Sequence, residues 1–379
     1  MQAMDSAQSH LLQIAQRVRA AAADATPLRI RGGGTKDFHG LALQGELLDT
    51  RALAGVVSYE PSELVVTVRA GTPLAEVEAL LAAQCQCLAF EPPHFDGDSS
   101  NATVGGMVAS GLSGPSRASV GAVRDFVLGL EMINGQGELL RYGGQVMKNV
   151  AGYDVSRLMA GSWGALGLIT EVSLKVLPVA PAEATLRFAC SQQQALDWLN
   201  AWGGQPLPLN ASCWLQEEGA AQGVLYLRLR GARAAVQAAC ERLGGERMHS
   251  AAADWQACRE QQLPWFTARA PGHALWRLSV PQTAPALALP DGCTGPLIEW
   301  HGALRWVQAP RALGHALRAL AKAAGGSATL FRSEAADQPG AEPDFDAQAA
   351  DATAALHARL KQAFDPAGIF NRGRLAAAW

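Results

Sequence analysis

The first eighty residues alternate between helix-like and strand-like spacing of apolar positions. Residues 1–24 are typical of an amphipathic helix. Leu28–Arg31 and residues 63–71 are short apolar runs that predict strands, the second being rich in β-branched side chains. Residues 60–63 predict a turn before the second strand. Residues 72–84 predict a helix, with a threonine cap and a proline at its first position.

The next hundred residues are rich in glycine and predict a second layer of strands. Residues 124–142 contain two strand-like runs, and Asn134-Gly135 between them is typical of a hairpin turn. Residues 164–178 predict a further strand that ends at a proline. Residues 179–184 are the best candidate for an interdomain linker.

After this linker the pattern becomes strand, helix, strand, strand, helix, strand, which is the ferredoxin-like plan. The predicted elements are residues 183–189, 192–203, 210–216, 223–231, 232–245 and 246–252. A final helix is predicted over 351–364, before a tail at 365–375. Eight of the ten tryptophans lie between Trp198 and Trp306, and we expect them to pack in a core rather than to form an interface.

Composition excludes several classes of protein. The 379 residues carry a net charge of −3 and scattered basic residues, which argues against a nucleic-acid ligand. Charged residues make up only 17%, which fits either surface buried against a partner or an alanine-rich chain. The sequence has no apolar run of about 18 residues, so it predicts no membrane span. Its first residues do not resemble a secretory signal. We therefore expect a cytoplasmic protein, with peripheral membrane association through a complex as the alternative.

The seven cysteines are scattered and match neither iron–sulfur nor zinc spacing. We expect reduced, buried thiols and no metal site in this chain.

The stretch LRIRGGGTKDF, residues 28–38, places three glycines after a predicted strand. Such loops most often approach phosphate, because bare backbone N–H groups can face the anion. A Walker A loop is excluded by the order of Thr35 and Lys36. A Rossmann fingerprint is excluded because Asp37 occupies the position of its third glycine.

Three segments together resemble the FAD-binding domain of the vanillyl-alcohol oxidase family, also called the PCMH-type domain. They are PLRIRGGGTK, ATVGGMVASGLSGPSRASVGAVRDFVLGLEMINGQGE and KNVAGYDVSRLMAGSWGALGLITEVSLKVLP, and they span about residues 25–180 in unbroken order. The resemblance implies an α+β fold: a two-lobed FAD-binding domain, a ferredoxin-like cap and a C-terminal tail that returns to the FAD domain. The implied domains are residues 1–24, 25–180, 181–350 and 351–379.

The same resemblance implies where FAD would bind. The first glycine loop would hold the pyrophosphate, the segment from 102 to 111 would approach the ribityl and flavin portions, and residues 152–154 and 161–169 would complete the cleft near the adenine. The tail NRGR would return to the flavin, although it lacks the family's proline. The implied cofactor-binding residues are Arg31, Gly32, Gly33, Gly34, Thr35, Lys36, Pro92, Thr103, Gly105, Gly106, Gly111, Gly121, Asp125, Val127, Gly152, Tyr153, Gly161, Gly164, Gly167, Ile169, Asn371 and Arg372.

Within that family, the chain resembles the smaller FAD-binding subunits of bacterial glycolate oxidases. Such subunits work with a larger FAD-binding subunit and an iron–sulfur subunit, oxidising glycolate to glyoxylate with an acceptor other than NAD. Covalent members of the family attach FAD through a histidine where this chain has Thr35, and His39 is out of register. The resemblance therefore implies non-covalent FAD.

Candidates for catalysis are few. Oxidation of a 2-hydroxy acid needs a base for the hydroxyl proton and a cation for the carboxylate. His301 and Arg305, in EWHGALRW, are the best available pair, and a strand there would place 301, 303 and 305 on one side. The histidine-rich segments of stand-alone D-2-hydroxyacid dehydrogenases are missing, which disfavours that alternative. A structural or assembly subunit without turnover of its own stays open.

Overall fold

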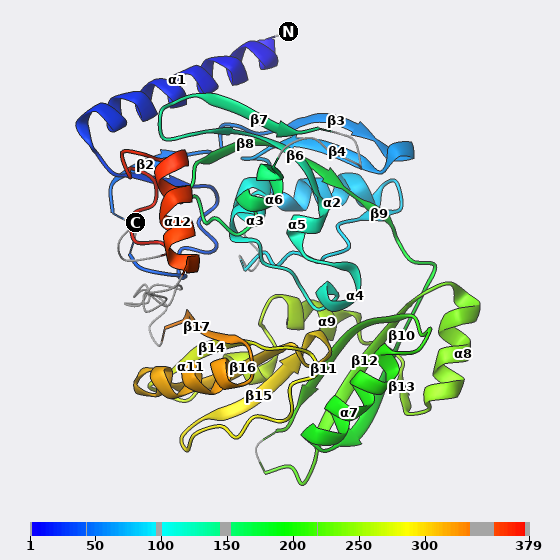
Figure 1. Ribbon diagram of the computed structural model, residues 1–379. Coiled ribbons are helices and arrows are strands. Elements are labelled where there is room, and N and C mark those ends of the chain that lie inside the picture. The colour runs from blue at the N-terminus through cyan, green and yellow to red at the C-terminus, as the bar shows by residue number, and fades with distance from the viewer. Residues whose placement is uncertain are drawn as a thin grey trace. The chain divides into compact units, whose positions relative to one another are not determined.

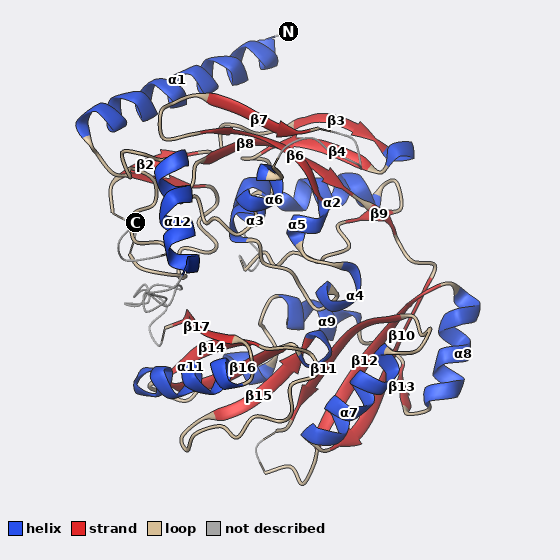
Figure 2. Cartoon of the chain, in the orientation of Figure 1, coloured by secondary structure: helices blue, strands red, loops and turns tan. Residues whose placement is uncertain are grey.

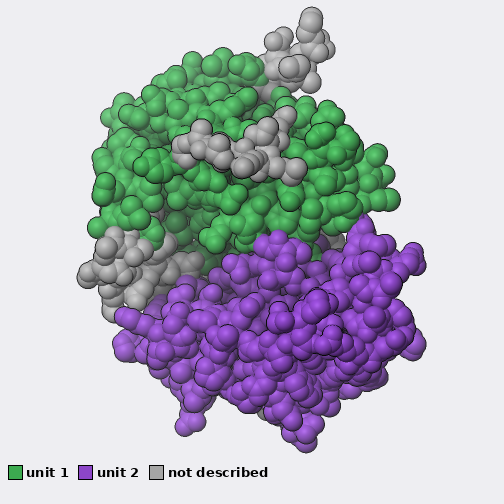
Figure 3. Space-filling model, turned by 45° about the vertical axis from the view of Figure 1, so that its right-hand side comes forward, with its two compact units in different colours: residues 1–112, 122–178, 339–379 green, residues 113–121, 179–338 purple. Residues whose placement is uncertain are grey.

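The computed structural model describes residues 2–42, 44–95, 101–144, 153–217, 219–333 and 352–375. The chain divides into two compact units, coloured separately in Figure 3. Unit 1 comprises residues 1–112, 122–178 and 339–379, and unit 2 comprises residues 113–121 and 179–338. The short segment 113–121 therefore packs with unit 2, although the chain on both sides of it belongs to unit 1.

Unit 1 is built on a five-stranded antiparallel sheet with the order β3-β4-β8-β6-β7 (Figure 2). Figure 1 shows α2, α3, α5 and α6 on one side of this sheet. The strands of the sheet are β3 (Val56–Glu60), β4 (Val65–Arg69), β6 (Val127–Ile133), β7 (Leu139–Gly143) and β8 (Leu168–Lys175). The helices on that side are α2 (Leu74–Ala82), α3 (Val104–Ser110), α5 (Val123–Phe126) and α6 (Val155–Met159). A short pair, β5 (Gln86–Cys87) with β9 (Leu177–Pro178), completes this lobe.

A second lobe of unit 1 brings the two ends of the chain together. The parallel pair β1 (Leu28–Arg31) and β2 (Glu46–Asp49) packs with α1 (Gln2–Asp24). The segment after α12 (Ala352–Phe364) joins the same core through Ile369 and Phe370, both fully buried. Helix formation by α1 follows its apolar stripe, since Ile14, Ala15, Val18 and Ala21 are its buried residues in this core.

Unit 2 contains an eight-stranded sheet with the order β13-β10-β12-β11-β15-β16-β14-β17. Its first half is the predicted ferredoxin-like unit, since its strands stand in the order fourth, first, third, second, which confirms that part of the fold class. The strands of that half are β10 (Ala182–Cys190), β11 (Leu209–Leu215), β12 (Gly223–Gly231) and β13 (Glu246–Met248). Its helices are α7 (Gln192–Gly203) and α8 (Arg233–Leu243).

The second half has the same strand order in reverse, and the sequence pattern did not predict it. Its strands stand in the order second, third, first, fourth, so the halves meet through their second strands, β11 and β15, which pair antiparallel. These strands are β14 (His273–Ser279), β15 (Thr294–Glu299), β16 (Leu304–Pro310) and β17 (Ser327–Arg332). The remaining helices of unit 2 are α4 (Arg117–Val120), α9 (Ala252–Arg259), α10 (Pro264–Thr267) and α11 (Gly314–Ala323).

Short 3-10 turns link several elements of the two units. They are η1 (Pro61–Glu63), η2 (Trp300–Gly302) and η3 (Arg311–Leu313). The first of them confirms the turn that was predicted over 60–63.

The tryptophans largely confirm the core prediction. The side chains that are fully or almost fully buried are those of Trp214, Trp255, Trp276, Trp300 and Trp306. The cysteines are free thiols, but the expectation that all are buried is wrong, because Cys85 is exposed. No group of metal-ligating side chains is found in the parts of the chain that the structure describes. Among these same parts, no helix is long and apolar enough to cross a membrane.

The hairpin predicted at Asn134-Gly135 is confirmed, since β6 and β7 pair antiparallel on either side of it. Its connection is a five-residue loop, 134–138, in which Asn134 Oδ1 accepts from the amides of Gln136 and Glu138, both at 3.0 Å. The threonine cap predicted for the helix α2 is wrong. The hydroxyl of Thr72 does not cap α2. It donates to the Arg69 carbonyl at 2.7 Å and accepts from the Gly55 amide, so it joins two loops instead.

Candidate functional site

Unit 1 contains an open cavity where the strand ends of both lobes meet. Small residues dominate its walls. Two glycine segments that lie far apart in the sequence, 32–34 and 164–167, both contribute to the lining. The lining residues are Ile30, Arg31, Gly32, Gly33, Gly34, Thr35, Lys36, Asp37, Thr50, Ala70, Thr103, Gly105, Gly106, Ala109, Ser110, Trp163, Gly164, Gly167, Ile169, Asn371 and Arg374.

The first two glycines of the loop after β1 are required because another segment of the same chain packs against them. A side chain at Gly32 would overlap the hydroxyl of Thr103, which caps α3 by accepting from the Gly106 amide. A side chain at Gly33 would overlap the backbone carbonyl of Asn101. The crowding that these glycines relieve is therefore protein against protein, and the cavity lies beside this contact.

Backbone conformation accounts for two further glycines. Gly34 has φ +75°, and its missing side chain leaves room for the Arg31 guanidinium, which pairs with Asp37 at 2.6 Å. Gly164 has φ +74°, and a Cβ there would contact the side-chain nitrogen of Asn371. Both positions lie in the left-handed region that glycine adopts without cost.

Two buried cations belong to the cavity wall. Lys36 Nζ donates to Thr35 Oγ1 and to the His94 carbonyl, both at 3.2 Å, and lies 8% exposed. Arg374 donates to the Lys36 carbonyl at 2.6 Å, and its guanidinium lies 5.1 Å from the centre of the Trp163 ring. Both residues line the cavity and place basic side chains in its wall, which suits an anionic ligand.

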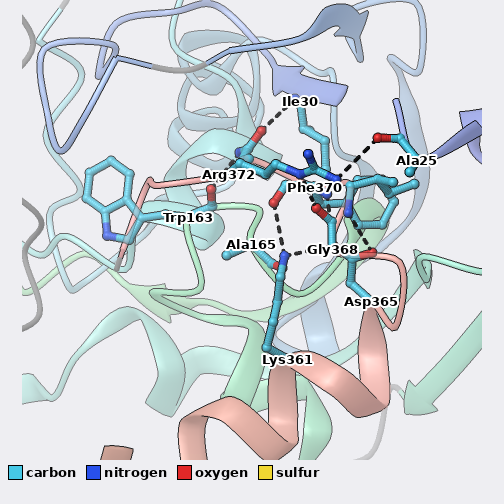
Figure 4. Close-up of polar contacts among 11 residues, drawn as sticks. Ala25, Ile30, Trp163, Ala165, Lys361, Asp365, Gly368, Phe370 and Arg372 are labelled. Carbon is cyan, nitrogen blue, oxygen red and sulfur yellow. Dashed lines mark hydrogen bonds and ion pairs between the residues drawn. The ribbon is translucent and has the colours of Figure 1, made fainter. Parts of the chain in front are cut away.

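The C-terminal tail supplies one wall through Asn371. Its Oδ1 accepts from the Ile30 amide at 2.8 Å, and its Nδ2 donates to the Trp163 carbonyl at 2.7 Å. Figure 4 draws Ile30 and Trp163, the residues whose backbone groups bond to this side chain. The amide of Asn371 also donates to Leu28 at 3.0 Å. One side chain thus joins the strand that leads into the first glycine loop to the second glycine loop.

Most of the residues that the sequence assigns to the cofactor meet in this cavity. Those in its wall are Arg31, Gly32, Gly33, Gly34, Thr35, Lys36, Thr103, Gly105, Gly106, Gly164, Gly167, Ile169 and Asn371. Sequence reasoning missed Ile30, Asp37, Thr50, Ala70, Ala109, Ser110, Trp163 and Arg374 as individual residues. A helical signal could have found two of these, because Ala109 and Ser110 follow Gly105 and Gly106 by one turn of α3.

Several assigned residues lie outside the cavity wall and have local structural contacts. Gly111 ends α3 with φ +64° and packs on Gly161, whose amide donates to Val108. Asp125 accepts from the Ala122 amide at 2.9 Å at the start of α5. The others that do not line the cavity are Pro92, Gly121, Val127, Tyr153 and Arg372. Tyr153 is 98% exposed, and Gly152 lies outside the described residues. Their roles toward a cofactor stay predictions.

His301 lies in the turn η2, so the expected strand placement of 301, 303 and 305 is wrong, since β16 begins at Leu304. Its Nδ1 lies 3.1 Å from Ser212 Oγ, and its Nε2 lies 3.2 Å from Ser119 Oγ. Burial lowers the pKa of His301 from 6.5 to about 4. The imidazole is therefore neutral at pH 7 and is held between two hydroxyls.

Arg305 is fully buried and hydrogen-bonds to the backbone. Its three nitrogens donate to the carbonyls of Gly302 at 3.2 Å, Pro285 at 2.6 Å and Ala284 at 2.6 Å. Burial lowers its pKa to about 10, which still leaves it charged at pH 7. These bonds fix the 284–285 loop against η2, and a role as carboxylate anchor stays a prediction.

Known proteins resemble this chain in sequence and in fold. Residues 9–143 match the family model described as an FAD binding domain. The glycolate oxidase subunit GlcE of Escherichia coli (strain K12) is 46% identical over 363 residues, covering 96% of each chain. The glycolate oxidase subunit GlcD of Bacillus subtilis (strain 168) is 32% identical over 163 residues, 42% of this chain and 34% of that protein.

Solved structures share the fold at low identity. A p-cresol methylhydroxylase structure with substrate bound gives a TM-score of 0.67 at 14% identity, covering 97% of this chain and 88% of that one. An alkyldihydroxyacetonephosphate synthase gives 0.63 at 15% identity, covering 94% and 74%. These likenesses confirm the α+β, PCMH-type fold class.

The cavity itself fits FAD. At Gly106 a Cβ would meet only the Thr103 hydroxyl, at 3.1 Å, so the space beside this glycine is not filled by protein. Buried cations at Lys36 and Arg374 suit a doubly charged diphosphate. The open cavity, the small residues in its walls and the basic side chains in its lining therefore agree with a flavin dinucleotide.

Proposed function

The chain belongs to the family of the glycolate oxidase subunit GlcE, whose members are FAD-binding flavoproteins, and we propose that it is the FAD-binding subunit of a multi-subunit glycolate oxidase. In this proposal glycolate is oxidised to glyoxylate, and electrons pass through flavin to an acceptor other than NAD. A larger FAD-binding subunit and an iron–sulfur subunit complete the enzyme. The complex is cytoplasmic, with peripheral contact to the inner face of the membrane.

The observation that carries the proposal is the cavity of unit 1. Lys36 and Arg374 would face the diphosphate of FAD, and the backbone amides of residues 32–35 would approach it along the cavity lining. FAD, when bound, would accept the hydride that leaves the alcohol carbon of the substrate. The small residues of α3 that line the cavity, Gly105, Gly106, Ala109 and Ser110, keep that side of the cavity open.

Attachment of FAD is non-covalent in this proposal. Thr35, in the position where covalent members carry histidine, lines the cavity, and its hydroxyl accepts a hydrogen bond from Lys36. His39 is buried and stacks on Trp163 with ring centres 4.2 Å apart. His39 does not line the cavity, and its ring is held against Trp163, so this chain offers no histidine at the position used for covalent attachment.

A second candidate function is an assembly subunit without turnover of its own. It is favoured by the placement of His301 and Arg305, the best candidates for base and carboxylate anchor. Both are engaged by hydroxyls or backbone carbonyls of unit 2. If no other group replaces them, the reacting site for glycolate lies in the larger subunit, and the flavin of this chain relays electrons or supports assembly.

An anaerobic spectrum separates these functions. The purified chain, loaded with FAD, is titrated with glycolate alone and then with the larger subunit added. We expect the flavin of this chain to bleach only when the partner is present, which supports electron relay. Bleaching by glycolate alone would show independent turnover. A flavin that never bleaches in the complete complex would favour the assembly role, and a chain that cannot bind FAD would contradict the proposal.

A further inference from the structure

The tail that follows α12 is held by a buried ion pair that lies outside the cavity wall. Asp365 has a fully buried side chain and accepts from the amides of Ile369 at 3.0 Å and Phe370 at 2.8 Å. Lys361 Nζ lies 2.7 Å from Asp365 Oδ2, one helical turn away. The pair thus closes the loop 365–370 on itself (Figure 4).

The same ammonium also reaches the second glycine loop. Lys361 Nζ donates to the Ala165 carbonyl at 2.7 Å and to the Phe370 carbonyl at 3.0 Å. All three of its N–H donors are therefore used, one on the carboxylate and two on backbone. Ala165 stands next to Gly164 in the cavity wall, and Phe370 precedes Asn371, which is also in the wall. One buried charge ties together two segments that both line the cofactor cavity.

Apolar packing of the tail would not by itself fix the orientation of Asn371. Ile369 and Phe370 are fully buried with residues of α1, β1 and β2, which holds the tail to unit 1. Hydrophobic burial is non-directional, whereas Asn371 must place its amide between two backbone groups at 2.7 and 2.8 Å. Directional bonds on either side of Phe370, from Lys361 and Asp365, set that position.

A glycine in a neighbouring loop supports this interpretation. A Cβ at Gly135 would lie 2.7 Å from the Cα of Asp365 and 2.5 Å from its Oδ1. The Gly135 amide also donates to the Phe364 carbonyl at 2.8 Å. The β6–β7 loop is thus shaped around Asp365, and the carboxylate is enclosed from three sides: its own loop, α12 and this loop.

Resting on the proposed function, we propose that Lys361 and Asp365 are positioning residues for FAD, and that docking of the tail and binding of FAD stabilise each other. The pair does not touch the cavity. It fixes Asn371, which spans the two glycine loops, and so holds both loops at the spacing that the dinucleotide needs. By thermodynamic reciprocity, bound FAD must then hold the tail more firmly in place.

The test uses the full-length apoprotein, reconstituted with FAD. Variants K361M and D365N are compared with K322M, which removes an exposed lysine from α11 of unit 2. Flavin fluorescence gives the dissociation constant of FAD, and mass spectrometry follows chymotryptic cleavage after Phe364 and Phe370. We expect K361M and D365N to weaken FAD binding about tenfold or more and to expose both cleavage sites. K322M should match the wild type, in which FAD slows the cleavage.

Circular dichroism verifies that each variant is folded. Should K361M fail to fold, D365N still carries the test, because asparagine keeps the shape of the side chain and one acceptor oxygen. Folded variants that bind FAD within about twofold of the wild type, or a wild-type tail that FAD does not protect, would overturn the inference and leave the proposed function standing. A wild-type chain that binds no FAD at all would remove the proposed function, and this inference with it.

Discussion

Gly33 is required by the backbone of another segment, and this distinguishes it from glycines that serve a turn. Its φ is not in the left-handed region, so a side chain would be tolerated by the local backbone, but a Cβ would meet the Asn101 carbonyl. A carbonyl oxygen cannot move aside as a flexible side chain can. Substitution must therefore separate the first glycine loop from the segment that leads into α3, and both line the cavity.

We predict that Gly33→Val destabilises unit 1 by roughly 1–3 kcal/mol, the usual cost of overpacking, and weakens FAD binding at least about tenfold. Gly203→Ala is a matched control, because no atom lies near its Cβ and alanine favours the helix α7. Denaturant unfolding and flavin titration measure both effects. Unaltered flavin affinity in folded Gly33→Val would contradict the placement of the cofactor beside this loop.

His301 gives unit 2 a dependence on acidic pH. In the folded chain its pKa is lowered from 6.5 to about 4 by burial, so between these values the unfolded chain binds more protons. The stability associated with the neutral imidazole is fully present above pH 6.5 and is lost as the pH falls toward 4. The loss is at most about 3 kcal/mol.

We predict that His301→Asn makes the stability of unit 2 less dependent on pH between 6.5 and 4. Asparagine suits the test because it tolerates the positive φ of this position, +54°, and does not titrate. Urea unfolding at pH 7 and pH 5, followed by tryptophan fluorescence, measures the difference. An equally steep loss of stability in the variant would show that other groups cause it.

At the scale of elements, the periodicity of apolar residues predicted those helices and strands that the local sequence determines. The helix over 192–203 and the strand over 223–231 were found with the same bounds as α7 and β12, because each has a complete apolar pattern. The ferredoxin-like order followed from the alternation of these elements. The second half of the sheet was not foreseen, since its strands are separated by loops without a helical pattern before β15.

The wrong predictions have different causes. Thr72 was expected to cap α2 but bonds to Arg69 and to Gly55, which is 17 residues away. His301 was expected in a strand, but its neighbours Trp300 and Gly302 also have positive φ, so the chain turns there. The glycine motifs found much of the cavity wall because they are local in sequence. Arg374 was missed because only the folded tail brings it to Lys36.

The β6–β7 loop offers a prediction at this scale. Asn134 is 4% exposed, and its side chain bonds to two amides and to Glu138 Oε2 at 2.8 Å. Asn134→Ala leaves these amides without their acceptor, and we expect a loss of about 1–3 kcal/mol in unfolding free energy. Gln136→Ala is the control, because the backbone amide of residue 136 remains able to donate to Asn134. Equal stability of the two variants would contradict the assigned role.

For the whole molecule, the assignment of the FAD cavity to unit 1 alone predicts an uneven response to the cofactor. Every residue of the cavity wall belongs to unit 1, and a ligand stabilises only the folded state that binds it, by about 2.7 kcal/mol at a hundred times its dissociation constant. Hydrogen exchange with and without FAD should therefore slow in residues 31–37, 161–169 and 365–374, and stay unchanged in β10–β13.

Residues 113–121 make this test decisive, because they adjoin unit 1 in the sequence but pack with unit 2. They follow α3, which lines the cavity, yet they pack with unit 2: Trp300 donates to the Gly114 carbonyl at 2.9 Å, and Ser119 contacts His301. If packing governs local stability, this segment exchanges with unit 2, ignores FAD and loosens when the pH is lowered toward 4. Protection of 113–121 by FAD to the same degree as the glycine loops would instead show that the two units respond as one.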